Sequence, residues 1–175
     1  MPQVRTQATN AGAIPFAPPV EAFKDAMRHL ASSVSLVTAG TGDERRGLTC
    51  SAMTSVSMGP PTLLACVNRE SEAVKTISKY GSFCVNILGK PDQDVAECFA
   101  GRTELKGLDK FKPFQWRDMP SGAPALESAL VNIDCALAQT VYMHSHLVFF
   151  GTVKTVWREN EQDPLIHYNR QFFTI

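Results

Sequence analysis

Small and hydroxyl-bearing side chains crowd the segment GLTCSAMTSVS, residues 47–57, which is followed closely by a Gly-Pro-Pro sequence. The segment looks extended, yet few of its side chains are large and apolar, so it is poorly suited to packing a core. Small side chains allow another molecule to approach the backbone closely. We therefore expect this segment to lie against a ligand that offers many hydrogen-bond acceptors.

The loop VNRES, residues 67–71, is a second candidate for ligand binding. It joins an apolar run to a helical pattern, which sets Asn68, Arg69 and Ser71 at the helix N-terminus. The free N–H groups there attract phosphate, and an arginine and a hydroxyl add further donors. In the simpler alternative, Ser71 only caps the helix and Arg69 is solvent-exposed. The residues alone leave both interpretations open.

Three other features carry weaker chemical signals. The run AGTGDERRG, residues 39–47, has Arg45 at the third glycine position of a dinucleotide motif and no helix after it, so we predict a hairpin turn. His144 and His146 stand two apart, but no third ligand is evident and we expect no metal. The five cysteines are odd in number and lack a C-x-x-C pair, which indicates reduced core residues.

The whole chain favours a small-molecule partner. Its 175 residues fit one domain, which we place at 19–175 behind a flexible N-terminal arm, 1–18. Seventeen basic and seventeen acidic residues are scattered, so we expect no binding to nucleic acid or membranes. No apolar run approaches the ~20 residues of a membrane span, and no secretion signal is evident, which favours a cytoplasmic protein.

Hydrophobic periodicity predicts a mainly β protein with short peripheral helices. We expect helices over 20–31, with Phe23, Met27 and Leu30 in a buried stripe, from Ser71 to Gly81, and from Pro91 to Gly101. Strands are predicted over 34–39, 48–57, 62–68, 82–88, 130–143 and 146–157, and a long packed loop over 102–128. The last two strands suggest a hairpin. Because regular β-α-β alternation is missing, we expect a closed antiparallel barrel.

The ordered set GLTCSAMTSVSMGPPTLLACVNRES, FCVNIL, FAG, SHLVFFGTV and PLIHYNRQF resembles the short-chain flavin reductase family over about residues 22–175. These proteins are the small partners of two-component flavin-dependent monooxygenases, and the likeness is greatest to the reductases of 4-hydroxyphenylacetate and chlorophenol hydroxylase systems. The resemblance implies a split β-barrel and a homodimer. It also implies reduction of FMN or FAD by NADH or NADPH, with a separate monooxygenase that receives the reduced flavin.

The resemblance also implies roles for individual residues. The positions that would line the flavin ring are Thr49, Cys50, Ser51, Ala52, Met53, Thr54 and Ser55. Those for the phosphate end are Val67, Asn68, Arg69 and Ser71, and those for the ribityl and adenine side are Val85, Asn86, Phe99 and Ala100. His146 matches a catalytic histidine near the nicotinamide, and Arg170 matches a tail position that approaches the flavin or the dinucleotide.

Three positions depart from the family pattern. His144-Ser145-His146 replaces a common Gly-Asp-His, Thr152 replaces a glutamate, and His167 replaces a frequent tyrosine. The leading hypothesis is hydride transfer from nicotinamide C4 to flavin N5. The alternatives are a non-catalytic flavin or haem carrier or sensor, and an oxidase of the pyridoxamine phosphate type on the same barrel.

Overall fold

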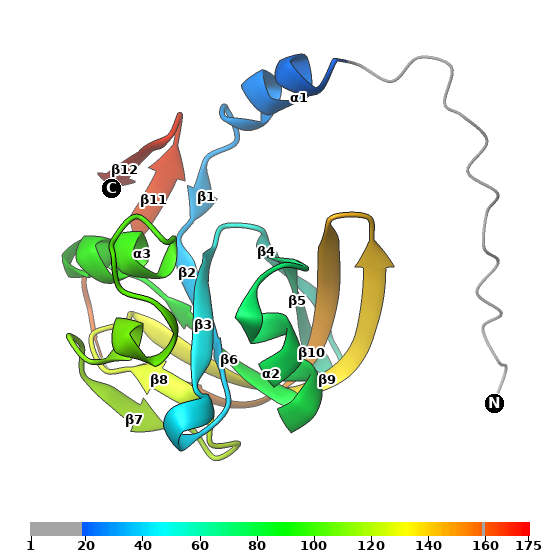
Figure 1. Cartoon of the computed structure of the whole chain (residues 1–175), viewed down its shortest axis with the longest axis vertical. Coiled ribbons are helices and arrows are strands. Elements are labelled where there is room, and N and C mark those ends of the chain that lie inside the picture. The colour runs from blue at the N-terminus through cyan, green and yellow to red at the C-terminus, as the bar shows by residue number, and fades with distance from the viewer. Residues whose placement is uncertain (1–18, 159) are drawn as a thin grey trace, which may run out of the picture.

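A computed structural model describes residues 19–158 and 160–175, and the predicted arm, 1–18, lies outside this part (Figure 1). Seven strands form an antiparallel sheet in the order β3-β2-β6-β9-β10-β5-β4. Their bounds are Ser35–Ala39 for β2, Arg46–Cys50 for β3, Met53–Met58 for β4, Pro61–Asn68 for β5, Ser82–Ile87 for β6, Val131–Met143 for β9 and His146–Trp157 for β10. The sheet curls around its core as a split barrel, which confirms the predicted fold class.

The long β9–β10 hairpin forms much of the barrel wall, as its alternating sequence predicts. Its inward side chains include Phe149, which is fully buried, as is Phe83 of β6. At Gly151 a Cβ atom would lie 2.5 Å from Phe83 Cζ and 2.7 Å from Cys135 Cβ. The core is therefore packed so closely that this position in β10 requires glycine.

Two helices flank β3, one on each side (Figure 1). Helix α2, Glu72–Tyr80, begins after Ser71, whose Oγ accepts a hydrogen bond from the Ala73 N–H at 3.3 Å, and it ends at Gly81 with φ 63°. Helix α3, Gln93–Phe99, follows a 3-10 turn at Lys90–Asp92. Helix α2 confirms the sequence prediction, because cap and stop residues mark its ends. The predicted second helix also exists, but its α-helical part begins at Gln93, since Pro91 lies in the 3-10 turn.

The predicted strand 48–57 is two strands, because the chain crosses the barrel seam within it. Strand β3 ends at Cys50, and β4 begins at Met53 on the opposite edge of the sheet. Between them, the Ala52 carbonyl accepts a hydrogen bond from the Cys66 N–H at 2.9 Å. Ser51 and Ala52 thus lie outside the regular strand pairing, at the point where the chain passes from one edge of the sheet to the other.

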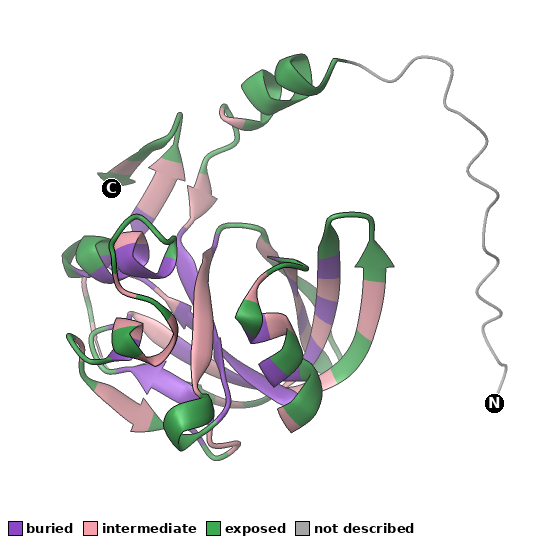
Figure 2. Cartoon of the chain, in the orientation of Figure 1, coloured by how far each residue is buried: buried purple, intermediate pink, exposed green. Residues whose placement is uncertain are grey.

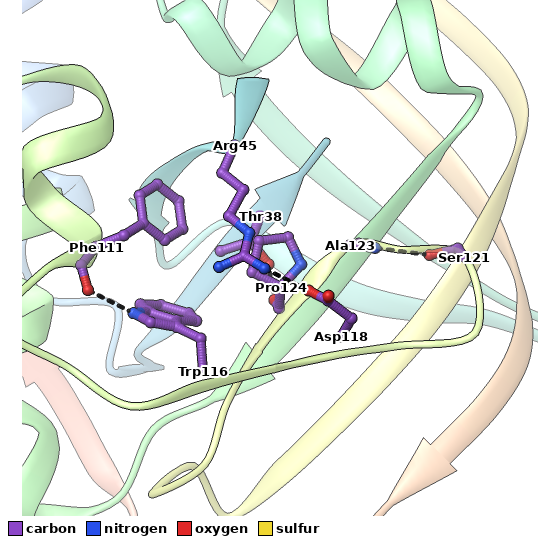
Figure 3. A network of polar contacts seen from close by, with 8 residues as sticks. All are labelled: Thr38, Arg45, Phe111, Trp116, Asp118, Ser121, Ala123 and Pro124. Carbon is purple, nitrogen blue, oxygen red and sulfur yellow. Dashed lines mark hydrogen bonds and ion pairs between the residues drawn. The ribbon is translucent and has the colours of Figure 1, made fainter. Parts of the chain in front are cut away.

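The predicted loop 102–128 also contains regular structure. It holds a 3-10 helix, Gly107–Phe111, and a small hairpin of β7, Trp116–Asp118, and β8, Pro124–Leu126. In Figure 3 the Trp116 indole N–H donates to the Phe111 carbonyl at 2.9 Å, and Arg45 reaches Asp118 at 2.7 Å. The first contact joins the hairpin to the 3-10 helix, and the second fastens it to the turn between β2 and β3, which is the predicted turn at 39–47.

Helix α1, Val20–Met27, is shorter than predicted and none of its residues is buried. The predicted buried stripe is wrong for the single chain, since Phe23 is 57% exposed and Leu30 is 60% exposed. Figures 1 and 2 show the helix projecting from the barrel as a largely exposed element. No helix in the described part of the chain is long and apolar enough to cross a membrane.

A three-stranded sheet at the chain's end completes the fold. Its central strand is β11, Leu165–Tyr168, which pairs with β1, Ser32–Ser33, on one side and with β12, Gln171–Thr174, on the other. The two-residue turn between β11 and β12 places Asn169 at φ 48° and Arg170 at φ 65°. Two positive φ angles define a type I′ turn, whose second position strongly favours glycine. An L-residue in this region costs ~1 to 2 kcal/mol, so Arg170 occupies a strained position.

Candidate functional site

Four adjoining cavities run along one side of the barrel, and together we call them the groove. Their volumes are about 480, 420, 230 and 470 Å³, taken from the α2 end to the α1 end. The first and second share Ser71, the second and third share Thr49, and the third and fourth share Ser51 and His167. Three of the four volumes fall within the ~300 to 1,000 Å³ that is typical of small-molecule sites.

The middle of the groove is the hydroxyl-rich segment predicted to face a ligand. Thr49 lines it, although its hydroxyl donates to the Ala96 carbonyl at 2.6 Å and so ties β3 to α3. Ser51 and Ala52 are exposed there, where small side chains leave the backbone accessible. Thr54 and Ser55 are also exposed and Met53 is half-buried, but these three line none of the four cavities.

Cys50 faces inward from the same segment. Its thiol donates to the Cys66 carbonyl at 3.5 Å, and burial raises the pKa of Cys50 to about 11. The thiol therefore stays protonated at neutral pH and is a poor nucleophile. The structure supports a packing role for Cys50 and gives it no direct contact with the groove.

The α2 end of the groove contains the predicted phosphate loop. Arg69 and Ser71 line the first cavity, and both also have structural partners. Ser71 caps α2, and Arg69 pairs with Glu70 at 2.9 Å and donates to the His144 carbonyl at 3.4 Å. Asn68 lines the second cavity, whereas Val67 is fully buried behind it. The capping and ligand-binding interpretations are thus compatible for Ser71.

Four cationic residues of this end were missed by sequence reasoning, and one of them is Lys75 of α2, which lines the first cavity. Arg46 of β3 lines the first cavity and pairs with Glu72 at 3.1 Å. Lys106 and Lys110 line the second cavity from the segment predicted as an irregular loop. Lysines scattered through a polar loop carry no local signal of a site, because only the folded path of residues 102–111 brings them beside α2.

The C-terminus of α3 forms the opposite wall. Ala100 is exposed and lines the second and third cavities, as expected for a ligand-facing position. Phe99 borders the second cavity but is only 2% exposed, and it packs edge-on against Phe111 at 4.9 Å between ring centroids. A Cβ atom on Gly47 would lie 2.9 Å from Phe99, so glycine lets β3 pass close to this ring.

Val85 and Asn86, which were predicted to border the cofactor, line none of the four cavities. Both are fully buried in β6, which lies between β2 and β9 in the sheet. The Asn86 amide oxygen accepts from the Leu126 N–H at 2.7 Å and from Asn132 at 2.9 Å, and its NH₂ group donates to Thr38 at 3.0 Å. Asn86 therefore holds the β7–β8 hairpin on the barrel.

His146 does not line the groove. It begins β10, where it pairs in register with Asn68, is exposed, and lies 2.9 Å from the Ser145 hydroxyl. Its catalytic role stays a prediction without support from the cavities. His167 does line the groove, and burial together with the nearby Arg102 lowers its pKa, which favours the neutral imidazole. Arg170 lines the fourth cavity, consistent with its predicted approach to a ligand.

Comparison with protein families places this geometry in context. Residues 27–175 match the family model described as "Flavin reductase like domain". A protein from Methylorubrum extorquens named FMN reductase (NADH) RutF is 41% identical over 154 residues, which cover 88% of this chain and 74% of the relative. The protein of the same name from Pseudomonas syringae pv. syringae is 35% identical over 86% of this chain and 84% of its own length.

Solved structures show the same fold. A putative flavin reductase from Haemophilus somnus aligns with a TM-score of 0.85 and 31% identity, over 90% of this chain and all of that chain. The flavin reductase component BorF of a bacterial two-component tryptophan halogenase gives 0.82 and 29%, over 90% and 98%. The NADH:FAD oxidoreductase SgcE6 of Streptomyces globisporus, solved with NAD and FAD fragments, gives 0.79 and 26%, over 86% and 89%.

Proposed function

The chain belongs to the flavin reductase-like domain family and is an NAD(P)H-dependent flavin reductase, and from this premise we propose that it uses NADH to reduce FMN. The observation that carries the choice of NADH and FMN is the 41% identity to a relative named FMN reductase (NADH). The cavities lined by Arg69, Ser71, Lys106 and Lys110 support it, because they offer cations and a hydroxyl to a phosphate.

The groove's chemistry fits a flavin along its length. Ser51, Ala52 and Ala100 expose backbone through small side chains, which suits close contact with a flat ring. Arg69 and Ser71 would hold the phosphate end, and Thr49 fixes β3 against α3 between the two parts. When bound, the flavin accepts the hydride from the nicotinamide and thus supplies the redox chemistry. The protein's own task is to hold both molecules in register.

We further propose that the reduced flavin leaves the groove for a separate oxygenase. Two observations support release. Ser51, Ala52, Arg69 and Ala100, which line the groove, are exposed to solvent, and a structural neighbour is described as the flavin reductase component of a two-component halogenase. The five free cysteines support a location in the reducing cytoplasm.

The decisive test of the proposed function is NADH oxidation by the purified protein with and without added FMN. We expect turnover only when flavin is present, with FMN preferred to FAD and NADH preferred to NADPH. Turnover without added flavin would contradict release of the reduced flavin. Tight flavin binding with no oxidation of either dinucleotide would instead indicate a carrier or sensor.

We also propose that the protein is a homodimer that covers α1. An eight-residue helix is marginal in water, yet α1 keeps an apolar stripe with no partner in the described chain. In Figure 1, α1 and the β9–β10 turn project from the same end of the barrel. Other exposed apolar side chains lie on β4 and at the β9–β10 turn, namely Val56, Met58, Tyr142 and Met143. A soluble monomer rarely leaves so much apolar surface uncovered.

The double substitution Phe23→Asp and Met27→Asp is expected to separate the two copies. Charges at two apolar positions of an interface cannot be buried without partners, so the variant should elute as a monomer. Light scattering of the wild type should give twice the chain mass. Ile175→Asp, at an exposed apolar position outside this surface, is the control and should leave the mass unchanged. A wild type that is monomeric at micromolar concentration would contradict the proposal.

A further inference from the structure

The two ends of the groove differ in charge. The first two cavities are lined by five cations, Arg46, Arg69, Lys75, Lys106 and Lys110, and by three carboxylates, Glu44, Glu70 and Glu72. The third and fourth are lined by four cations, Lys24, Arg28, Arg102 and Arg170, and among the described residues by no carboxylate. The lining of the α1 end of the groove therefore carries only positive charge among the described residues, and its attraction for an anion depends on which of these cations lack a carboxylate partner.

The four cations at this end are not equally available. Lys24 pairs with Glu21 at 2.8 Å, Arg28 with Asp25 at 2.7 Å and, more loosely, Arg102 with Glu97 at 3.9 Å. Within the part of the chain that the structure describes, Arg170 makes no ion pair. Its guanidinium is thus the group at this end most available to an incoming anion.

The backbone conformation of Arg170 is one that favours glycine, which suggests that the arginine side chain has a function at this position. The residue occupies the glycine-favouring second position of the type I′ turn at φ 65°, although glycine would relieve the strain. The turn is itself anchored, because the Asn169 N–H donates to the Arg28 carbonyl at 2.8 Å and His29 lies 3.4 Å from the Tyr168 hydroxyl. A rigid turn thus carries an unpaired guanidinium to the wall of the fourth cavity.

The neighbouring wall extends the same surface. Arg102 lies over the Phe172 ring, with 5.5 Å between the guanidinium carbon and the centroid, and His167 meets the edge of this ring at 5.8 Å. His167 is shared by the third and fourth cavities, so the two arginines flank it along the groove. The arrangement offers hydrogen-bond donors from two elements to one elongated ligand.

We propose that Arg170, assisted by Arg102, binds a phosphate of the nicotinamide dinucleotide at the α1 end of the groove. The inference rests on the proposed function, which supplies a substrate with a pyrophosphate. The two anions of the reaction are thereby assigned to different ends of the groove. The flavin phosphate binds at the α2 end, whose lining has charges of both signs, and the dinucleotide pyrophosphate binds at the α1 end, whose lining has no carboxylate among the described residues. Thr49 lines the second and third cavities and Ser51 the third and fourth, so the reacting rings would meet beside this part of the groove.

The test is equilibrium binding of ADP-ribose, which carries the pyrophosphate without the nicotinamide and needs no turnover. Calorimetry of Arg170→Gly should show binding weakened about tenfold or more, because a charge-assisted contact is lost. Adenosine, which lacks phosphate, should bind wild type and variant equally. Arg102→Gln should show a smaller loss, since Arg102 already has a carboxylate neighbour.

Asn169→Gly is the matched control, because it alters the same turn and keeps the guanidinium. It should bind ADP-ribose like the wild type. Arg170→Gly should fold well, since glycine removes the strain, and a melting temperature higher by about 2 to 4 °C is expected. A structural role for the arginine predicts the reverse, a less stable variant with unchanged binding.

Two results would overturn the inference. Unchanged ADP-ribose binding in Arg170→Gly would show that no dinucleotide phosphate lies there. Loss of FMN binding with riboflavin binding unchanged would assign this end to the flavin phosphate. Both results are distinct from failure of the proposed function, which would appear as absence of flavin-dependent NADH oxidation in the wild type.

Discussion

Replacing Asn86 by alanine is expected to lower the free energy of unfolding by about 3 to 5 kcal/mol and to leave flavin affinity unchanged in the folded protein. Asn86 is fully buried, and its amide satisfies Asn132, Thr38 and the Leu126 N–H. Removing it leaves several buried polar groups without partners, each at a cost of ~1 to 3 kcal/mol. The loss should also loosen the β7–β8 hairpin, which Asn86 holds at Leu126.

Denaturant unfolding measures the first effect, and FMN titration well below the melting temperature measures the second. Asn160→Ala is the control, because Asn160 makes two hydrogen bonds to carbonyls but is only half-buried. It should cost about 1 kcal/mol or less, since water can replace the lost partners. Normal stability with weakened FMN binding in Asn86→Ala would return Asn86 to the ligand site.

The elements that sequence reasoning predicted well have local causes. Helix α2 was predicted from Ser71 and Gly81 because capping and left-handed termination depend on residues within one turn. The β9–β10 hairpin follows from alternation along strands of 13 and 12 residues. The antiparallel barrel followed from these elements and from the missing β-α-β pattern.

The errors arise where the outcome depends on distant partners. Residues 48–57 have one continuous pattern, but β3 and β4 bond to different neighbours, so the chain must break at the seam. The stripe on α1 is genuine, but the described chain provides no surface to cover it. A periodic pattern reports an apolar face and cannot report which molecule covers that face.

Only part of the site was predicted, because some of its residues also depend on distant partners in the fold. Ser51, Arg69, Ser71 and Ala100 lie in local contexts that resemble the family, and all four line the groove. Val85 and Asn86 resemble it equally well, but a central strand buries both faces and the pattern of a strand does not say which face meets a ligand. His167, Lys106 and Arg102 join the groove only through long-range packing, so no short motif marks them.

The double substitution Arg69→Ala and Ser71→Ala is expected to weaken FMN binding by roughly tenfold and riboflavin binding by less than twofold. Charge-assisted hydrogen bonds are worth ~1.5 to 3 kcal/mol, but the Arg69 side chain is 61% exposed, so screening by solvent reduces its contribution. The ratio of the two affinities is the measurement, because riboflavin lacks the phosphate and reports any general damage from the lost α2 cap. Equal losses for both flavins would place the phosphate elsewhere.

A substitution of Glu70 is expected to have the opposite effect on FMN affinity at the same part of the groove. Its carboxylate lies 2.9 Å from Arg69 Nε and lines the first two cavities, where it competes with a bound phosphate for the guanidinium. Glu70→Gln removes that competition and keeps the side-chain shape, so FMN binding should tighten about two- to fivefold, in the range of a surface ion pair. Riboflavin binding should not change. Weaker FMN binding in Glu70→Gln would contradict this expectation. It would mean that the Glu70 carboxylate holds Arg69 in the position in which it binds the phosphate.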